Sequence, residues 1–226
     1  MGRLNFDKDV IAEIKKSYTE NEEIYIRDMK ATEINEIESI GVFQRIEPFM
    51  KEWEKELKTY NSILDLGCGV GYLFKLLDLE KHVIKVGVDF SSVSIKKCNH
   101  FFTGDNYYFY AEDALDFLRR SNDNEYDAVT AFGVIEHIPD RGKVLECYKE
   151  MGRVAKRTVL IANYGCSEYN EGFFLTKCGN ENKLLFYFKQ PMNEFIADVE
   201  KSTGLKVTSS IVAKLYNLIA IEKEGQ

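Results

Sequence analysis

Apolar positions in the first quarter of the chain recur with a helical period. From residue 7 to residue 58, isoleucine, valine and aromatic residues return every three or four positions, which predicts amphipathic helices. Gly41 and Pro48 are expected to interrupt this helical region, because both residues disfavour a helix interior. Residues 1–58 are therefore predicted to form an N-terminal helical cap.

Beyond residue 58, short apolar runs alternate with amphipathic stretches. The predicted strands are Ser62–Leu66, Ile84–Asp89, Tyr107–Ala111, Ala128–Gly133, Thr158–Asn163, Lys206–Ala213 and Asn217–Ile221. The predicted helices are Tyr72–Leu79, Ser92–Asn99, Ala114–Arg120, Arg141–Val154 and Met192–Thr203. Several strands are continuously apolar, which is typical of strands that helices cover on both faces.

The order of these elements predicts an α/β fold with a doubly wound, seven-stranded and mostly parallel sheet. Alternating strands and helices favour right-handed crossovers between parallel strands. Only Lys214–Tyr216 joins the last two strands, so these should pair as a terminal antiparallel hairpin. Residues 59–226 are thus predicted to form the core domain. A loop insertion is expected at 164–190, where neither period fits and where lids or substrate loops often occur.

Composition and charge narrow the class of protein. The formal net charge is −7 and no dense run of lysine and arginine occurs, which argues against a nucleic-acid partner. No apolar run reaches the length of a membrane span, and residues 1–23 lack a signal-peptide core. The five cysteines show no metal-ligand spacing, which favours reduced thiols. We therefore expect a soluble, cytoplasmic protein without a metal site.

The most informative chemistry follows the first predicted strand. There Asp65 precedes three glycines at alternate positions, Gly67, Gly69 and Gly71, with Cys68 between the first two. Alternate glycines permit positive φ and a close approach of backbone to a ligand. The spacing differs from the Gly-x-Gly-x-x-Gly of dinucleotide-binding turns. The acid at the strand's end can attract a cationic amino-acid head.

The second predicted strand also ends in an acid. In an open α/β sheet, ligands bind beyond the carboxyl ends of the strands. The Asp89 carboxylate can accept hydrogen bonds from both hydroxyls of a ribose, and Phe90 can lie against an adenine ring. The alternative is that Asp89 caps the next helix, a role for which Ser91 and Ser92 compete.

This series of strand ends resembles that of class I S-adenosylmethionine (SAM) dependent methyltransferases. The glycine turn resembles the first signature motif of this family. Asp113 and Ala114 resemble the family's adenine site, in which the carboxylate accepts the exocyclic amine. The local alternative is that Asp113 is the N-cap of the following helix. The segment after the fourth strand resembles that of small-molecule methyltransferases, which implies that Phe132 and Gly133 face the methionine part of SAM.

The same segment continues with Glu136 and His137, which the resemblance places near the substrate. His137 is the natural candidate for a general base, because the ordinary pKa of histidine lies near neutrality. The alternative is that both residues order the turn before the next helix. Upstream, Phe43–Pro48 resembles a segment of ubiquinone-biosynthesis O-methyltransferases whose arginine pairs with the SAM carboxylate. This similarity points to Arg45, and the alternative is a solvated arginine on an amphipathic helix.

The resemblance implies a Rossmann-like methyltransferase that transfers the methyl group of SAM in line to a small-molecule acceptor and releases S-adenosylhomocysteine (SAH). The Arg45 segment favours O-methylation. A protein or peptide methyltransferase and a non-catalytic SAM- or SAH-binding protein stay open as alternatives. A nicotinamide oxidoreductase is opposed by the glycine spacing. The acceptor is expected between the N-terminal helices and the 164–190 insertion.

Overall fold

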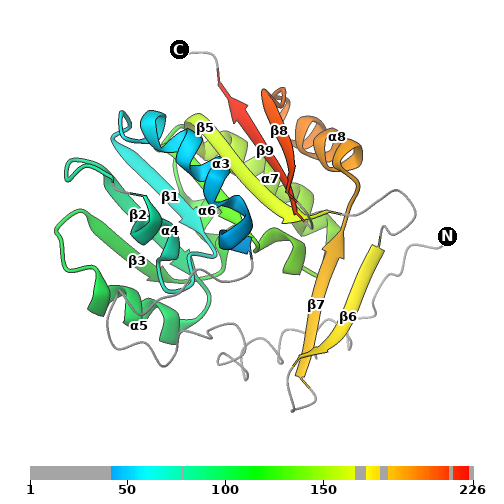
Figure 1. Ribbon diagram of the computed structural model, residues 1–226, viewed down its shortest axis with the longest axis horizontal. Coiled ribbons are helices and arrows are strands. Elements are labelled where there is room, and N and C mark those ends of the chain that lie inside the picture. The colour runs from blue at the N-terminus through cyan, green and yellow to red at the C-terminus, as the bar shows by residue number, and fades with distance from the viewer. Residues whose placement is uncertain (1–41, 78, 166–171, 179–182, 214–215, 224–226) are drawn as a thin grey trace.

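A seven-stranded sheet forms the centre of the part of the chain that the structure describes. The computed structural model describes residues 42–77, 79–165, 172–178, 183–213 and 216–223. The predicted helices before residue 42 lie outside these ranges. In the sheet the strand order is β3-β2-β1-β4-β5-β9-β8 (Figure 1). The strands are β1 (Ser62–Leu66), β2 (Ile84–Asp89), β3 (Tyr107–Ala111), β4 (Tyr126–Phe132), β5 (Ala155–Tyr164), β8 (Ser209–Ala213) and β9 (Tyr216–Glu222).

Strand direction follows the prediction from the sequence. The first five strands pair in parallel, and Leu64 on the central strand β1 lies opposite Val86 on β2 and Val129 on β4. Strand β9 pairs antiparallel with both β5 and β8. The strand order reverses at β1 and β4, so the carboxyl ends of these two strands are where this fold class binds its ligands.

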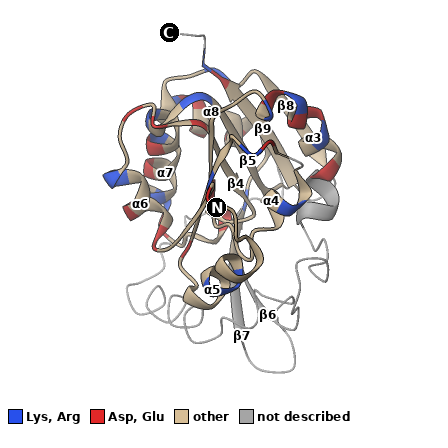
Figure 2. Ribbon diagram, turned by 90° about the vertical axis from the view of Figure 1, so that its left-hand side faces the viewer, with Lys and Arg blue, Asp and Glu red and all other residues tan. Residues whose placement is uncertain are grey.

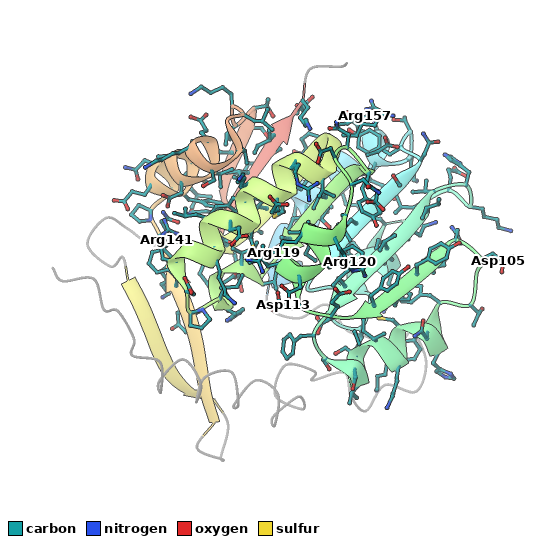
Figure 3. All side chains as sticks on the ribbon, turned by 180° about the vertical axis from the view of Figure 1, so that it is seen from behind. Asp105, Asp113, Arg119, Arg120, Arg141 and Arg157 are labelled. Carbon is teal, nitrogen blue, oxygen red and sulfur yellow. The ribbon has the colours of Figure 1, made fainter. Side chains whose placement is uncertain are left out.

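Helices cover both faces of the sheet. Figure 1 shows α3 and α4 in front of the sheet, and Figure 3 shows α6 and α7 on the opposite face. The helices are α3 (Val42–Leu57), α4 (Tyr72–Leu76), α5 (Ser92–Phe101), α6 (Ala114–Arg120), η3 (Ile135–His137, a 3-10 turn), α7 (Arg141–Val154) and α8 (Met192–Thr203). None of these helices has the length and apolar character needed to cross a bilayer.

Two hydrophobic clusters hold these layers together. On β5 the side chains alternate between them: Val159 and Ile161 pack with α6, α7 and α8, whereas Leu160 and Ala162 pack with α3, α4 and α5. This alternation explains why β5 reads as a continuous apolar run, since both of its faces are buried. Along the helices, acidic and basic residues are interspersed (Figure 2).

Helix α3 corrects one prediction. Pro48 was expected to interrupt the helical region, but it lies inside α3. Its ring removes one backbone hydrogen bond from the helix interior. The next two residues, Phe49 and Met50, are buried against the sheet together with Leu57. Burial of these side chains on the sheet offsets the lost hydrogen bond. Gly41 lies outside the described residues.

The expected loop insertion at 164–190 contains a β-hairpin instead. Strands β6 (Gly172–Cys178) and β7 (Lys183–Lys189) pair antiparallel in a separate sheet, which extends away from the main body (Figure 1). Both strands are rich in aromatic and branched residues, which favour extended backbone. The prediction of an irregular loop was therefore wrong for this part of the insertion.

Some element boundaries also move. Strand β4 begins at Tyr126 and β5 at Ala155, both earlier than expected, while β8 begins only at Ser209. Helix α4 ends at Leu76 rather than Leu79. Tyr126 and Ala155, the first residues of β4 and β5, are both buried, but charged residues separate them from the apolar runs that predicted these strands.

Burial on β5 leads to a test of the sheet's core. Ile161 is fully buried on β5, whereas Ile211 on the edge strand β8 is 40% exposed. Ile161→Ala should lower the free energy of unfolding by about 2–5 kcal/mol, because it leaves a cavity in a packed layer. Ile211→Ala, the matched control, should change it by only about 0.5 kcal/mol. Urea denaturation measures both values, and equal losses would contradict the assigned core.

Candidate active site

The glycine turn connects β1 to α4 in a left-handed backbone conformation. Gly67, Gly69 and Gly71 have φ values of 65°, 52° and 82°, which side chains rarely adopt. A Cβ at Gly67 would lie 2.5 Å from Val134, and one at Gly71 would lie 2.5 Å from the ring of Phe102. A Cβ at Gly69 would meet no described atom within 4 Å. The outer glycines are therefore required by packing, and Gly69 leaves open space for a ligand.

Asp89, at the end of β2, holds this turn in place. Its Oδ2 accepts a hydrogen bond of 2.9 Å from the Gly69 N–H, and its Oδ1 accepts one of 2.8 Å from the Ser91 N–H. The N-cap of α5 is Ser91, whose hydroxyl oxygen accepts from the Ser94 N–H. Ser91, and not Asp89, therefore caps α5. The ring of Phe90 is 44% exposed beside this carboxylate, where the ribose and adenine roles stay predictions.

Asp65 is a buried carboxyl at the end of β1, with only 2% of its surface exposed. Its Oδ1 accepts a hydrogen bond of 2.7 Å from the Thr130 hydroxyl of β4. Its Oδ2 has no hydrogen-bond partner among the described residues. Burial, with a smaller contribution from the negative charge of Asp89, raises the pKa of Asp65 to about 7. A buried carboxylate oxygen without a partner suits a cationic amino group.

Asp113 forms the N-cap of α6. Its Oδ1 accepts hydrogen bonds from the backbone N–H groups of Leu115 and Asp116, at 2.9 and 3.3 Å. This is the local alternative considered for Asp113, and it uses one carboxylate oxygen. Figure 3 shows Asp113 beside the arrowhead end of β3. The adenine contact predicted for Asp113 and Ala114 would use the other oxygen and the backbone.

The end of β4 leads into the 3-10 turn η3. Phe132 is buried, and Gly133 has a φ of 70° while its N–H donates to the Ala162 carbonyl at 3.0 Å. This hydrogen bond fixes the turn to β5. The next residue, Val134, packs against Gly67. Phe132 and Gly133 therefore lie close to the glycine turn. Their contact with the methionine part of SAM stays a prediction.

Glu136 and His137 occupy different environments within η3. Glu136 is 2% exposed, and its carboxyl accepts a hydrogen bond from the Tyr164 N–H at the end of β5. The Asn163 side chain lies between this carboxyl, at 3.3 Å, and the Tyr148 hydroxyl, at 2.7 Å. Burial raises the pKa of Glu136 to about 8. This placement favours the alternative in which Glu136 orders the turn.

His137 lies half-buried within a group of aromatic side chains. Its ring meets the Tyr164 ring edge-on, with the ring centres 6.0 Å apart. The Tyr164 ring also stacks on Tyr216 at 4.7 Å and contacts Tyr187 at 5.0 Å. These tyrosines come from β5, β9 and β7. Tyr164 and Tyr187 belong to the segment in which the sequence predicted part of the acceptor site. The sequence did not bring Tyr216 into the site, because only the antiparallel pairing of β5 with β9 places it there.

Two further predictions concern the limits of the site. Arg45 belongs to α3, but its side chain lies outside what the structure describes, so its pairing with the SAM carboxylate stays a prediction. Within the described ranges, no three histidine, cysteine, aspartate or glutamate side chains gather in a way that could hold a metal ion.

Comparison with known proteins identifies the family. Residues 57–215 match the profile of a methyltransferase domain family, so the chain belongs to this family. The ubiquinone biosynthesis O-methyltransferase of Pasteurella multocida (strain Pm70) is 25% identical over 103 residues, which cover 41% of this chain and 42% of that protein. The chloroplastic tocopherol O-methyltransferase of Arabidopsis thaliana is 30% identical over 106 residues, which cover 45% of this chain and 29% of that protein. The chain therefore matches less than half the length of these curated relatives.

Solved structures share the fold. Magnesium protoporphyrin IX methyltransferase from Synechocystis PCC 6803 with bound SAM superposes with a TM-score of 0.64 at 11% identity, covering 99% of this chain and 100% of that chain. A SAM-dependent methyltransferase from Methanosarcina mazei gives 0.61 at 18% identity, covering 73% and 93%. The predicted class I methyltransferase fold is confirmed, and the Synechocystis enzyme that shares it was solved with SAM bound.

The environment of Asp65 predicts a dependence of stability on pH. The pKa of Asp65 is about 7 in the folded protein against an ordinary 3.8, so the folded state holds a proton that the unfolded chain has lost. The free energy of unfolding should therefore fall as pH rises from about 4 to about 7. Asp65→Asn should make this decline shallower, leaving the part due to Glu136.

Urea denaturation at a series of pH values measures this slope. Asp105→Asn is the control, because Asp105 is exposed and lies far from the glycine turn (Figure 3). The control should keep the slope of the unaltered protein. A slope that Asp65→Asn leaves unchanged would show that Asp65 is ionised in the folded protein over this range.

Proposed function

We propose that this protein is a SAM-dependent methyltransferase that acts on a small-molecule acceptor, with an oxygen atom as the nucleophile. The observation that carries the proposal is the buried Oδ2 of Asp65, which has no described partner, together with the open position at Gly69. SAM has an amino group that Asp65 can bind and a ribose that Asp89 can reach. The turn between these two acids lets the cofactor pass close to the backbone.

The residues at the other strand ends complete this proposed binding site. Asp113 and Ala114 would recognise the adenine, with Phe90 against its ring, while Phe132 and Gly133 would line the methionine part. Arg45 would pair with the carboxylate, a role that suits the planar guanidinium group. Cys68 would contribute its backbone within the turn.

When bound, SAM supplies a methyl group on a positively charged sulfur, so the leaving group is already activated. The protein has to align the acceptor with that methyl group and keep water out. A hydroxyl acceptor must lose its proton, and we assign this step to His137, which would take the proton on a ring nitrogen. The products would be the methyl ether, SAH and a protonated His137.

The acceptor class is proposed from two observations. The two curated relatives described above both carry the name O-methyltransferase. The ring of Tyr164 contacts His137, and the rings of Tyr187 and Tyr216 pack against Tyr164, so that β5, β9 and the hairpin form an aromatic wall next to His137. Such a wall suits a flat, largely apolar acceptor with a hydroxyl group. Residues 1–58 and the 164–190 insertion would complete the acceptor site as an N-terminal cap and a covering segment.

Gly69→Val tests the placement of the cofactor. The valine side chain would fill the open space at this position and should abolish binding of SAM and SAH in isothermal titration calorimetry. Gly204→Val is the matched control, because Gly204 has a φ of 71° and also has no described atom within 4 Å of an added Cβ. Both variants carry the same backbone strain, but only the first should lose the cofactor. Unchanged affinity in Gly69→Val would refute the placement.

Binding of NAD should be measured in parallel with SAM and SAH. The proposal expects binding of SAM and SAH, and no binding of NAD. Binding of NAD without SAM would overturn the methyltransferase assignment. Binding of SAM without any methyl transfer to a broad set of acceptors would instead support a SAM-binding protein that does not catalyse the reaction.

His137→Phe tests the proposed base. The phenyl ring keeps the edge contact with Tyr164 but cannot accept a proton, so release of SAH in the presence of phenolic acceptors should fall about 100-fold or more. SAH affinity should stay within about twofold, since the cofactor residues are unaltered. His100→Phe, on the exposed surface of α5, is the control and should retain activity. Full activity in His137→Phe would remove His137 from the mechanism.

A further inference from the structure

Two buried thiols meet at the glycine turn. Cys68 lies within the turn, and Cys98 lies on α5, 30 positions later in the chain. The Cys98 Sγ donates a hydrogen bond of 3.2 Å to the Gly69 carbonyl, and the Cys68 Sγ lies 3.6 Å from the same oxygen. Both sulfurs therefore lie within reach of one backbone oxygen, which brings the two thiols together at the turn.

The fold makes specific room for this pair. A Cβ on Gly87 of β2 would lie 2.8 Å from the Cys68 Sγ, so glycine at this position lets the thiol sit over the strand. Both cysteines are in the reduced form and buried. Gly69 is thereby held from two sides. Its N–H donates to Asp89, and its carbonyl accepts from the two thiols.

We propose that Cys68 and Cys98 form a reversible disulfide that switches off cofactor binding at the glycine turn. The proposal rests on the proposed function, because it assigns SAM to this turn. The oxidant is hydrogen peroxide. One thiol attacks the peroxide oxygen and becomes a sulfenic acid with release of water, and the second thiol then displaces a second water as the S–S bond forms. Two electrons pass from the sulfurs to the peroxide.

The disulfide would act on Gly69. An S–S bond is about 2.05 Å long, so its formation draws the Cys68 side of the turn toward α5. It also removes both S–H donors from the Gly69 carbonyl. The turn then loses the geometry in which Gly69 leaves space for the cofactor. Reduction by a dithiol restores both donors and with them the binding conformation.

Burial of the two thiols controls when they can be oxidised. Burial, the neighbouring Cys98 and the negative charges of Asp89 and Asp65 raise the pKa of Cys68 well above its ordinary value, so the reactive thiolate is scarce while the turn is closed. Oxidation therefore requires the turn to open. A cofactor bound over Gly69 keeps the turn closed, so SAH should protect the two thiols. The disulfide would therefore inactivate enzyme without bound cofactor and would not form in enzyme that holds SAM or SAH.

The experiment uses the full chain, reduced and then treated with hydrogen peroxide. Tryptic mapping should find the peptides of Cys68 and Cys98 linked, and the intact mass should fall by two hydrogens. SAH affinity, measured by calorimetry, should fall about tenfold or more and return after treatment with dithiothreitol. Saturating SAH during the peroxide step should prevent the link.

Three variants serve as controls, each compared with itself before and after peroxide. Cys98→Ser and Cys98→Ala should keep their SAH affinity, and the alanine variant serves if the serine variant does not fold. Cys147→Ser removes a buried cysteine of the opposite core cluster and should respond like the unaltered protein. Folded protein that binds SAH but forms no Cys68–Cys98 link would overturn the proposal, as would linked protein with unchanged affinity.

The readouts also separate this proposal from the proposed function. If reduced protein binds no SAH, the methyltransferase assignment fails at that step. The peptide map still reports whether the disulfide forms, because it does not depend on the cofactor. A link formed in protein that never binds SAH would leave a redox-active pair without the switch and would reject the proposal as stated.

Discussion

The hydrogen bond from the Gly69 N–H to the Asp89 carboxylate is the constraint on which the site depends. It joins the turn after β1 to the end of β2, and the two residues that it connects are 20 positions apart in the chain. The parallel pairing of β1 and β2 fixes the position of Asp89 beside the end of β1. The sheet itself therefore determines the conformation of the turn. The left-handed glycines, the opening at Gly69 and the contact with two thiols all follow from this one anchor.

Two buried carboxyls near this anchor contribute differently. Both Asp65 and Glu136 have raised pKa values because they are removed from water. Glu136 receives a hydrogen bond from the backbone of β5, which ties η3 to the sheet. Each carboxyl also keeps one oxygen without a hydrogen-bond partner among the described residues, Oδ2 on Asp65 and Oε1 on Glu136, and Asp65 is the one at the ligand side of β1. A buried polar atom without a partner destabilises the fold, and a bound cation would compensate for that cost.

The sequence predicted the parts of the fold that depend on local pattern. Strands β1 to β5 were found because their apolar runs are short and separated by turn residues, and the glycine turn because its spacing is distinctive. The hairpin β6–β7 was missed since its aromatic residues fit neither period clearly. Burial of Glu136 and the packing of Tyr187 and Tyr216 against Tyr164 could not be predicted, because they depend on contacts between strands that are separate in the chain. Pro48 shows tertiary packing overriding a local preference.

The position of β9 between β5 and β8 has a consequence for how the chain folds as it is synthesised. Strand β5 is buried on both faces and pairs with β4 on one edge, but its other edge is filled by the last strand to be made. Until residues 216–222 have emerged, the hydrogen-bonding groups along that edge of β5 are available to a strand of another chain. A nascent chain stalled before β9 should therefore be prone to intermolecular pairing and should need protection by a chaperone. A strand with both faces buried is thus paired on its second edge only at the end of synthesis of the sheet.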